Sequence, residues 1–184
     1  FNGSFPSCLS SLKALQYLDL SRNQFNGPLP LDVAEMAELR YLNLGANNFS
    51  GEIPPEIGKL QFLEELNLES NALSGALPSE LGYLWRLESM YLEGNQLSGE
   101  IPESLSQLNN LTHLDLSNNN LSGSVPRNLG TNGKLEYLDL SGNKLTGNLP
   151  ESLGSCQSLI KIHLEKNMLS GSIPKSLFGL PNLT

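Results

Sequence analysis

A period of 24 residues runs through the whole chain and constrains its fold more than any other feature. Glycine recurs at this interval from Gly3 to Gly171, and proline follows three residues later each time, from Pro6 to Pro174. A fixed period of this kind is the signature of stacked repeat architectures. We therefore expect one domain over residues 1–184, with about seven full repeats, a partial repeat at each end and no caps. An asparagine recurs in every full repeat, at Asn23, Asn47, Asn71, Asn95, Asn119, Asn143 and Asn167.

Each repeat contains alternating leucines, which predict a short strand. In the segment Leu18–Leu20, Leu18 and Leu20 would face inward and Asp19 would face outward, because side chains alternate across a strand. One repeat is too small to bury its own leucines. Neighbouring repeats should therefore stack, so that their strands form a parallel sheet over a continuous apolar core.

The recurrent asparagine is expected to be structural. Where the chain turns out of each strand, backbone N–H and C=O groups face inward without a ladder partner, and an unpaired buried group is costly. An amide side chain both donates and accepts hydrogen bonds, so it can bridge neighbouring coils. The seven asparagines are therefore predicted to form a buried ladder.

The segment 95–126, NQLSGEIPESLSQLNNLTHLDLSNNNLSGSVP, shows the repeat most clearly. It resembles the plant-specific class of extracellular leucine-rich repeats. The resemblance implies an α/β fold, a right-handed superhelical solenoid with a concave parallel β-sheet, an extra short strand near Gly-x-x-Pro and short 3₁₀ turns on the convex side. Members of the class are mostly ectodomains of receptor-like kinases, receptor-like proteins and polygalacturonase inhibitors, which implies an extracellular or plasma-membrane location.

Both ends of the chain are similar to a narrower group. FNGSFP at the start and SCQSLIKIHLEKNMLSGSIPKSLFGLPNLT at the end resemble the CLAVATA and "barely any meristem" receptor kinases, which perceive CLE peptides. In that group the strand matching LIKIHLEKN carries two basic residues that bind the free C-terminal carboxylate of the peptide. Lys161 and His163 occupy these positions here, although the group usually has arginine at the second. Alternatively, Lys161 forms an ion pair with Glu136 or Glu165.

Outward-facing side chains of neighbouring strands should line up into a binding face. Tyrosine is enriched at interfaces because it offers a large and stiff contact area, although it also suits any exposed strand. The candidate peptide-binding residues are Lys161, His163, Tyr137, His113, Tyr91, Glu65, Glu69, Glu93, Tyr41 and Tyr17.

Two further clusters have open interpretations. The glutamates of the third and fourth repeats, among them Glu64 and Glu88, form either a docking patch for a basic peptide or a solvated surface. Phe62 and Trp85 stand before strands where other repeats carry polar residues. They either contact a partner along the lateral edge or cover their neighbours.

The composition argues against several classes of function. A formal net charge of -8 disfavours nucleic acid and anionic membranes as partners, and the apolar runs are too short to span a bilayer. No nucleophile motif, metal-ligand spacing or phosphate-binding loop is present. We therefore expect no enzymatic activity, no cofactor and no metal site.

The cysteines and glycosylation sequons bear on the compartment. Cys8 and Cys156 lie about six coils apart, on the order of 30 Å, which is too far for a disulfide. The chain begins and ends within a repeat, so we expect part of a longer array or a designed consensus array. Five sequons favour the secretory route, and they place candidate glycans on Asn2, Asn48, Asn110, Asn120 and Asn182.

The leading functional hypothesis is part of a plant receptor-like kinase ectodomain that recognises a short secreted peptide on its concave face. A shorter leucine-rich repeat co-receptor kinase would be a second partner. The alternatives are a wall protein similar to polygalacturonase inhibitors and a designed repeat scaffold without a ligand.

Overall fold

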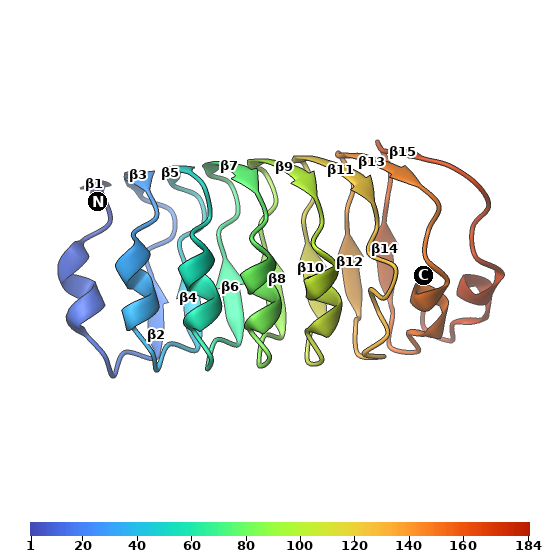
Figure 1. Ribbon diagram of the computed structural model, residues 1–184, viewed down its shortest axis with the longest axis horizontal. Helices are drawn as coiled ribbons and strands as arrows, with labels where there is room; N and C mark the ends of the chain where they lie inside the picture. Colours follow the sequence, from blue (N-terminus) through green and yellow to red (C-terminus); the bar gives the residue numbers. More distant parts are fainter.

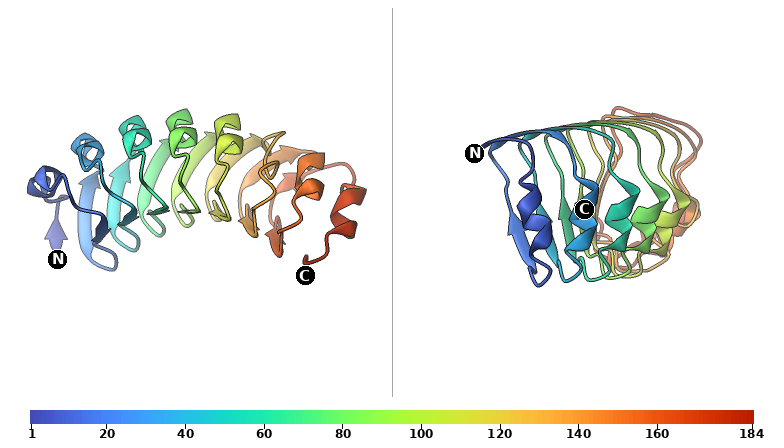
Figure 2. Two further views of the ribbon diagram at one scale, coloured as in Figure 1. Left: turned by 90° about the horizontal axis from the view of Figure 1, so that it is seen from below. Right: turned by 60° about the vertical axis from the view of Figure 1, so that its left-hand side comes forward.

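Each repeat forms one coil of an arc-shaped solenoid in the computed structural model, which describes residues 1–184 (Figure 1). A coil consists of a three-residue strand, a second short strand and, in most coils, a 3₁₀ helix. Figure 2 shows the 3₁₀ helices on the outer side of the arc and the three-residue strands on the inner side. No helix is both long and apolar enough to cross a membrane.

The inner side of the arc is a parallel seven-stranded sheet, called here the concave sheet. Its ladder pairs residues one repeat apart, as in Tyr17 with Tyr41. The strands begin one residue earlier than the leucine pattern predicted, because the paired register includes the outward residue that precedes the first inward leucine. The strands are β2 (Tyr17–Asp19), β4 (Tyr41–Asn43), β6 (Glu65–Asn67), β8 (Ser89–Tyr91), β10 (His113–Asp115), β12 (Tyr137–Asp139) and β14 (Lys161–His163).

A second parallel sheet of eight strands runs along the upper edge of Figure 1. Its ladder pairs residues 22 apart, as in Asn2 with Gln24, so equivalent residues of neighbouring coils are offset by two positions. The strands are β1 (Asn2–Gly3), β3 (Gln24–Pro28), β5 (Asn48–Gly51), β7 (Ala72–Ala76), β9 (Gln96–Glu100), β11 (Asn120–Ser124), β13 (Lys144–Gly147) and β15 (Met168–Leu169).

The convex side carries a 3₁₀ helix in every coil except the one between β11 and β12. In that coil Asn132 occupies the position at which Leu60, Leu84 and Leu108 enter the core elsewhere. The Asn132 amide instead donates to the carbonyls of Leu108 and Leu111, and the segment forms turns. The 3₁₀ helices are η1 (Ser7–Ser11), η2 (Leu31–Glu35), η3 (Pro55–Lys59), η4 (Ser79–Tyr83), η5 (Glu103–Gln107), η6 (Glu151–Ser155) and η7 (Lys175–Gly179).

Inward leucines of all coils form one continuous apolar core. Cys156 belongs to this core, where its thiol donates to the carbonyl of Leu135 at 3.1 Å, and burial raises the pKa of that thiol. Cys8 is exposed and both cysteines are free. Close stacking of the coils requires glycine at Gly82, because a Cβ there would lie 2.5 Å from the Ser104 carbonyl oxygen.

The recurrent asparagine connects consecutive coils, as Asn119 illustrates. Its amide nitrogen lies within hydrogen-bond distance of the carbonyls of Leu116 and Ser117 in its own coil and of Leu92 in the preceding coil, at 3.0–3.2 Å. Its amide oxygen accepts the backbone N–H of Leu97 in the preceding coil at 3.0 Å. One side chain thus satisfies backbone groups that have no ladder partner.

Burial of the seven asparagines is uneven. Asn95, Asn119 and Asn143 are buried. The remaining four are half-buried. Asn47, Asn71 and Asn167 donate to a carbonyl of the preceding coil, as Asn119 does. Asn23 donates only within its own coil, and its amide oxygen accepts a hydrogen bond from the amino group of Phe1.

We predict that Asn119→Ala lowers the free energy of unfolding by about 1–3 kcal/mol, the cost of leaving buried backbone groups unpaired. The matched control is Asn120→Ala, since Asn120 is exposed and its side chain makes no hydrogen bond; its cost should stay within about 0.5 kcal/mol. Chemical denaturation of both variants measures the difference. Equal stabilities of the two variants would contradict a bridging role for Asn119.

Candidate functional site

Outward side chains of the concave sheet line up in two columns, because the ladder pairs residues one repeat apart. Residues in both columns are exposed or half-buried, apart from Asp139, which is buried. The first column is Tyr17, Tyr41, Glu65, Ser89, His113, Tyr137 and Lys161. The second column is Asp19, Asn43, Asn67, Tyr91, Asp115, Asp139 and His163.

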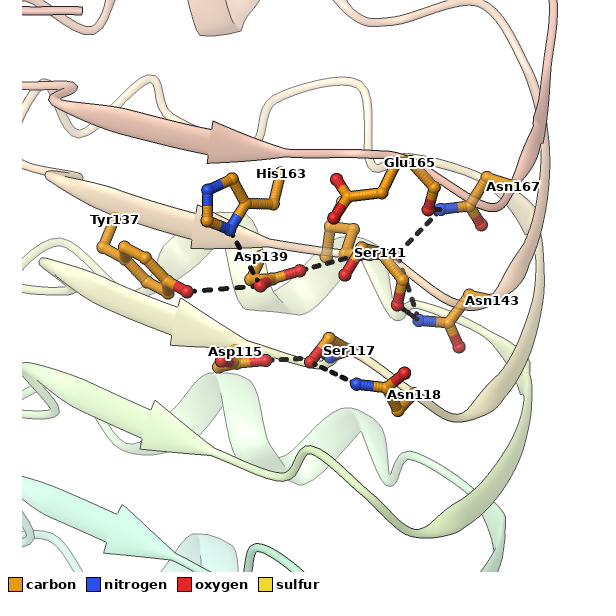
Figure 3. Close-up of polar contacts among 11 residues, drawn as sticks. Asp115, Ser117, Asn118, Tyr137, Asp139, Ser141, Asn143, His163, Glu165 and Asn167 are labelled. Atoms are coloured by element: carbon orange, nitrogen blue, oxygen red, sulfur yellow. Dashed lines mark hydrogen bonds and ion pairs between the residues drawn. The ribbon is translucent and has the colours of Figure 1, made fainter. Parts of the chain in front are cut away.

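At the β14 end of the sheet, Asp139 organises a polar cluster (Figure 3). Its Oδ2 lies 3.1 Å from Nδ1 of His163 and accepts a hydrogen bond from the Tyr137 hydroxyl at 3.2 Å. Its Oδ1 accepts the backbone N–H of Ser141 at 2.9 Å. Tyr137 lies between two imidazoles, with ring centres 6.2 Å from His113 and 5.7 Å from His163.

The protonation state of Asp139 decides which ring nitrogen of His163 carries a proton. Burial alone raises the pKa of Asp139, but hydrogen bonds from Ser141, His163 and Tyr137 outweigh burial and hold that pKa below its ordinary value. Asp139 is therefore a carboxylate at neutral pH and can only accept hydrogen bonds. The proton between the two groups belongs to Nδ1 of His163, and Nε2 carries the lone pair of the neutral ring.

Lys161 is exposed and its ammonium group forms no hydrogen bond or ion pair within the chain. The alternative that it pairs with Glu136 or Glu165 is therefore not realised in this structure. Lys161 and His163 are separated by one residue on β14, so both side chains point to the concave side. They form a basic end of the two columns.

A cavity of about 320 Å³ lies in the middle of the concave face. Its aromatic walls are Tyr91, His113 and Tyr137. Its carboxyl groups come from Glu69, Glu93 and Asp115, and Asn67 completes the lining.

The carboxyl groups of this cavity repel one another. Burial, followed by the neighbouring carboxyl group of Glu69, raises the pKa of Glu93 to about 8, and the charge of Asp115 acts in the same direction. Burial also raises the pKa of Asp115. Oε2 of Glu93 is enclosed and has no hydrogen-bond partner. No cationic side chain of the chain forms an ion pair with these carboxyl groups.

The β2 end of the face is an aromatic platform. The rings of Tyr17 and Tyr41 stack with centres 4.2 Å apart and planes inclined by 2°. Burial raises the pKa of Tyr41 to about 12, so its hydroxyl stays protonated. A neighbouring cavity of about 370 Å³ borders the platform, and its polar lining includes Glu65 and an Arg40–Glu64 ion pair of 2.5 Å.

The structure places all of the sequence-predicted candidates in two groups. Lys161, His163, Tyr137, His113, Tyr91, Glu69 and Glu93 surround the cluster at β14 and the central cavity. Tyr17, Tyr41 and Glu65 surround the cavity at the other end.

Asp139 was not among the site residues predicted from the sequence. Like Asp19 and Asp115, it accepts the backbone N–H two residues later. Only Asp139 also faces a histidine in the next coil. The sequence held one signal for this second role: Asp139 and His163 are one repeat apart, so they pair on neighbouring strands.

Comparison with known proteins identifies the repeat. The family described as leucine-rich repeat region matches residues 2–131, and the leucine-rich repeat family matches residues 134–156. No curated protein matches the chain.

Several solved structures resemble the chain over its whole length. A TDR receptor is 38% identical with a TM-score of 0.81, and the match covers 100% of this chain and 36% of that one. The Arabidopsis receptor kinase HAESA, in complex with the peptide hormone IDA and the co-receptor SERK1, is 35% identical with a TM-score of 0.80, covering 100% of this chain and 35% of that one. The chain thus spans about a third of the length of these receptors.

The same repeat also occurs outside receptors. A plant ice-binding protein is 30% identical with a TM-score of 0.76, and the match covers 95% of this chain and 64% of that one. Function therefore has to be argued from the site and not from the fold alone.

The raised pKa of Glu93 predicts a pH-dependent effect on stability. In the unfolded chain the pKa of a glutamate is about 4.3. Between this pH and about pH 8, Glu93 therefore holds a proton in the folded protein that it has lost in the unfolded chain. The stabilisation linked to this proton is complete below about pH 4 and is lost progressively as the pH rises from there to about 8. Glu93→Gln, which cannot ionise, should therefore raise Tm more at pH 9 than at pH 5.

We expect a difference of about 2–4 °C between the two pH values, after allowing for the partial exposure of Glu93. Glu100→Gln serves as the control, because Glu100 is exposed on the second sheet. Thermal unfolding followed by circular dichroism measures both variants. A Tm change of the same size at pH 5 and pH 9 would show that Glu93 titrates normally.

Proposed function

The chain belongs to the leucine-rich repeat family, and we propose that it is part of the ectodomain of a plant receptor kinase that binds a short secreted peptide. The solved structures that support this are plant receptor ectodomains, one of them in complex with a peptide hormone and a co-receptor. The proposal places the protein outside the cell, with a peptide on the concave face and a co-receptor kinase as a further partner. Glycans would occupy the sequons at Asn2, Asn48, Asn110, Asn120 and Asn182.

The proposal depends most directly on Lys161. Its ammonium group has no partner within the chain and stands at the end of a continuous column of aromatic and polar side chains. An ammonium group without an internal partner is available for an anion, and a charge-assisted hydrogen bond is roughly twice as strong as a neutral one. The free C-terminal carboxylate of a peptide is such an anion. The resemblance to CLE-peptide receptors in this segment supports the same assignment for Lys161 and His163.

The contact with Asp139 decides what His163 presents to a ligand at the proposed carboxylate site. Because Asp139 accepts the Nδ1 proton, the neutral ring presents only the Nε2 lone pair to a ligand, and this lone pair repels a carboxylate. Protonation adds an N–H at Nε2 and a positive charge. A carboxylate ligand can therefore accept a hydrogen bond from Nε2 only when both ring nitrogens of His163 carry a proton.

The rest of the peptide would cross the strands toward β2. It would pass Tyr137, His113 and Tyr91, then the carboxyl groups of Glu69 and Glu93. Six strand spacings separate β14 from β2, roughly 29 Å, which about nine extended residues cover. Glu69 and Asp115, which form no ion pair, favour a peptide that carries positive charge in its amino-terminal half, whereas Glu93 holds a proton below about pH 8. The stacked tyrosines at β2 would contact its first residues.

The test is a peptide titration by calorimetry with the double variant Lys161→Ala, His163→Ala. A CLE-type peptide with a free C-terminal carboxylate should bind the variant about 10–100-fold more weakly than the parent, the loss that one or two charge-assisted hydrogen bonds imply. The amidated peptide should bind both proteins weakly. Lys144→Ala, on the second sheet, is the control and should bind like the parent.

Unchanged affinity of the double variant for the free-acid peptide would refute the assignment of the carboxylate site.

A further inference from the structure

Arg86, a further cation without an ion pair, lies outside the concave face, on one of the loops that join each 3₁₀ helix to the next concave strand. These loops form the lower edge of Figure 1. Phe62 and Arg86 occupy equivalent positions one repeat apart, and Trp85 precedes Arg86. The other repeats place small or polar side chains in this part of the loop, such as Ala14, Glu38 and Asn110.

Two aromatic rings hold the guanidinium group of Arg86. Its Cζ atom lies 4.7 Å from the ring centre of Phe62 and 4.6 Å from that of Trp85. Rings packed over a guanidinium attract its charge and keep water away from its flat faces. The side chain is therefore ordered before any partner arrives, so less conformational entropy is lost when its N–H groups are bound.

Arg86 has no anionic partner in the chain. It forms no ion pair and no hydrogen bond, and its Nε is enclosed without a partner. Arg40, which lies 5.8 Å from the Phe62 ring centre, differs because Glu64 binds it. A guanidinium group is always charged and offers a planar fork of donors that matches a carboxylate.

The surroundings of Arg86 indicate a protein partner. Trp85 is 49% exposed and Tyr83 is 58% exposed. Tyr83 lies three residues before Arg86 in the chain, and tryptophan, tyrosine and arginine are the residues most enriched among those that dominate binding energy in protein interfaces. Glu64 and Glu88 lie on the same loops, and the net charge of -8 repels a polyanion. A single carboxylate flanked by apolar side chains fits this surface better than a nucleic acid or an acidic tail.

We propose that Phe62, Tyr83, Trp85 and Arg86 form a docking site for a protein partner, in which Arg86 binds one aspartate or glutamate side chain and the exposed rings contact apolar residues beside it. This site lies on the lateral edge, separate from the concave columns, and it does not depend on the peptide-binding proposal. The aromatic residues thus both cover Arg86 and present it to the partner.

Trp85 is the single tryptophan of the chain, so its indole N–H resonance reports on this site alone. The probe is an acetylated and amidated tripeptide, Leu-Glu-Leu, which carries one carboxylate. Titration of the protein with this probe should shift the indole resonance in a saturable way. The matched Leu-Gln-Leu peptide should bind at least about fivefold more weakly, since it lacks the charge that strengthens the hydrogen bond.

Two substitutions test the role of the guanidinium group. Arg86→Gln should weaken the Glu peptide at least about fivefold, and Arg86→Lys, which keeps the charge but loses the planar fork, should also weaken it. Arg127→Gln removes an exposed arginine of another coil and should leave the titration unchanged. Equal binding of the Glu and Gln peptides to the parent would overturn the proposal without any variant. Parent-like binding of the Glu peptide by Arg86→Gln would overturn it as well.

Discussion

Every part of this solenoid depends on the pairing of backbone groups at the bend that follows each concave strand. These groups leave the ladder while they still face the core, where an unpaired N–H or C=O is costly. One asparagine per coil satisfies them by hydrogen bonds to its own coil and to the preceding one. Because each bridge spans one repeat, it links the register of a coil to that of its neighbour.

This register turns a one-dimensional repeat into a two-dimensional surface. Residues one repeat apart become neighbours on the concave sheet, so side chains far apart in the sequence can share a ligand. Along the array, internal partners compensate some charges, such as Arg40 with Glu64. Lys161, Arg86 and the carboxyl groups around Glu93 have no such partner. Charges that the fold leaves uncompensated are the ones most available for binding.

The two proposed surfaces use different parts of the same coils. Concave strands present short columns suited to an extended peptide, whereas the loops before those strands present Trp85 and the ordered guanidinium group of Arg86 to the side. A ligand on one surface need not displace a partner on the other. The repeat itself is compatible with several functions, as the likeness to both receptors and an ice-binding protein shows. The argument for binding therefore depends on these particular side chains.

The sequence by itself determined the coil length, the inward leucines, the bridging asparagine and the membership of the two columns, because periodicity and strand alternation dictate which residues become neighbours. It did not reveal the loss of the 3₁₀ helix at Asn132, the pairing of Asp139 with His163, the burial that raises the pKa of Glu93, or the packing of Arg86 against two aromatic rings. Only the tertiary structure decided these, since they depend on side-chain conformations and on distances between coils. A repeat pattern gives the neighbours of a residue, but not which of them its side chain contacts.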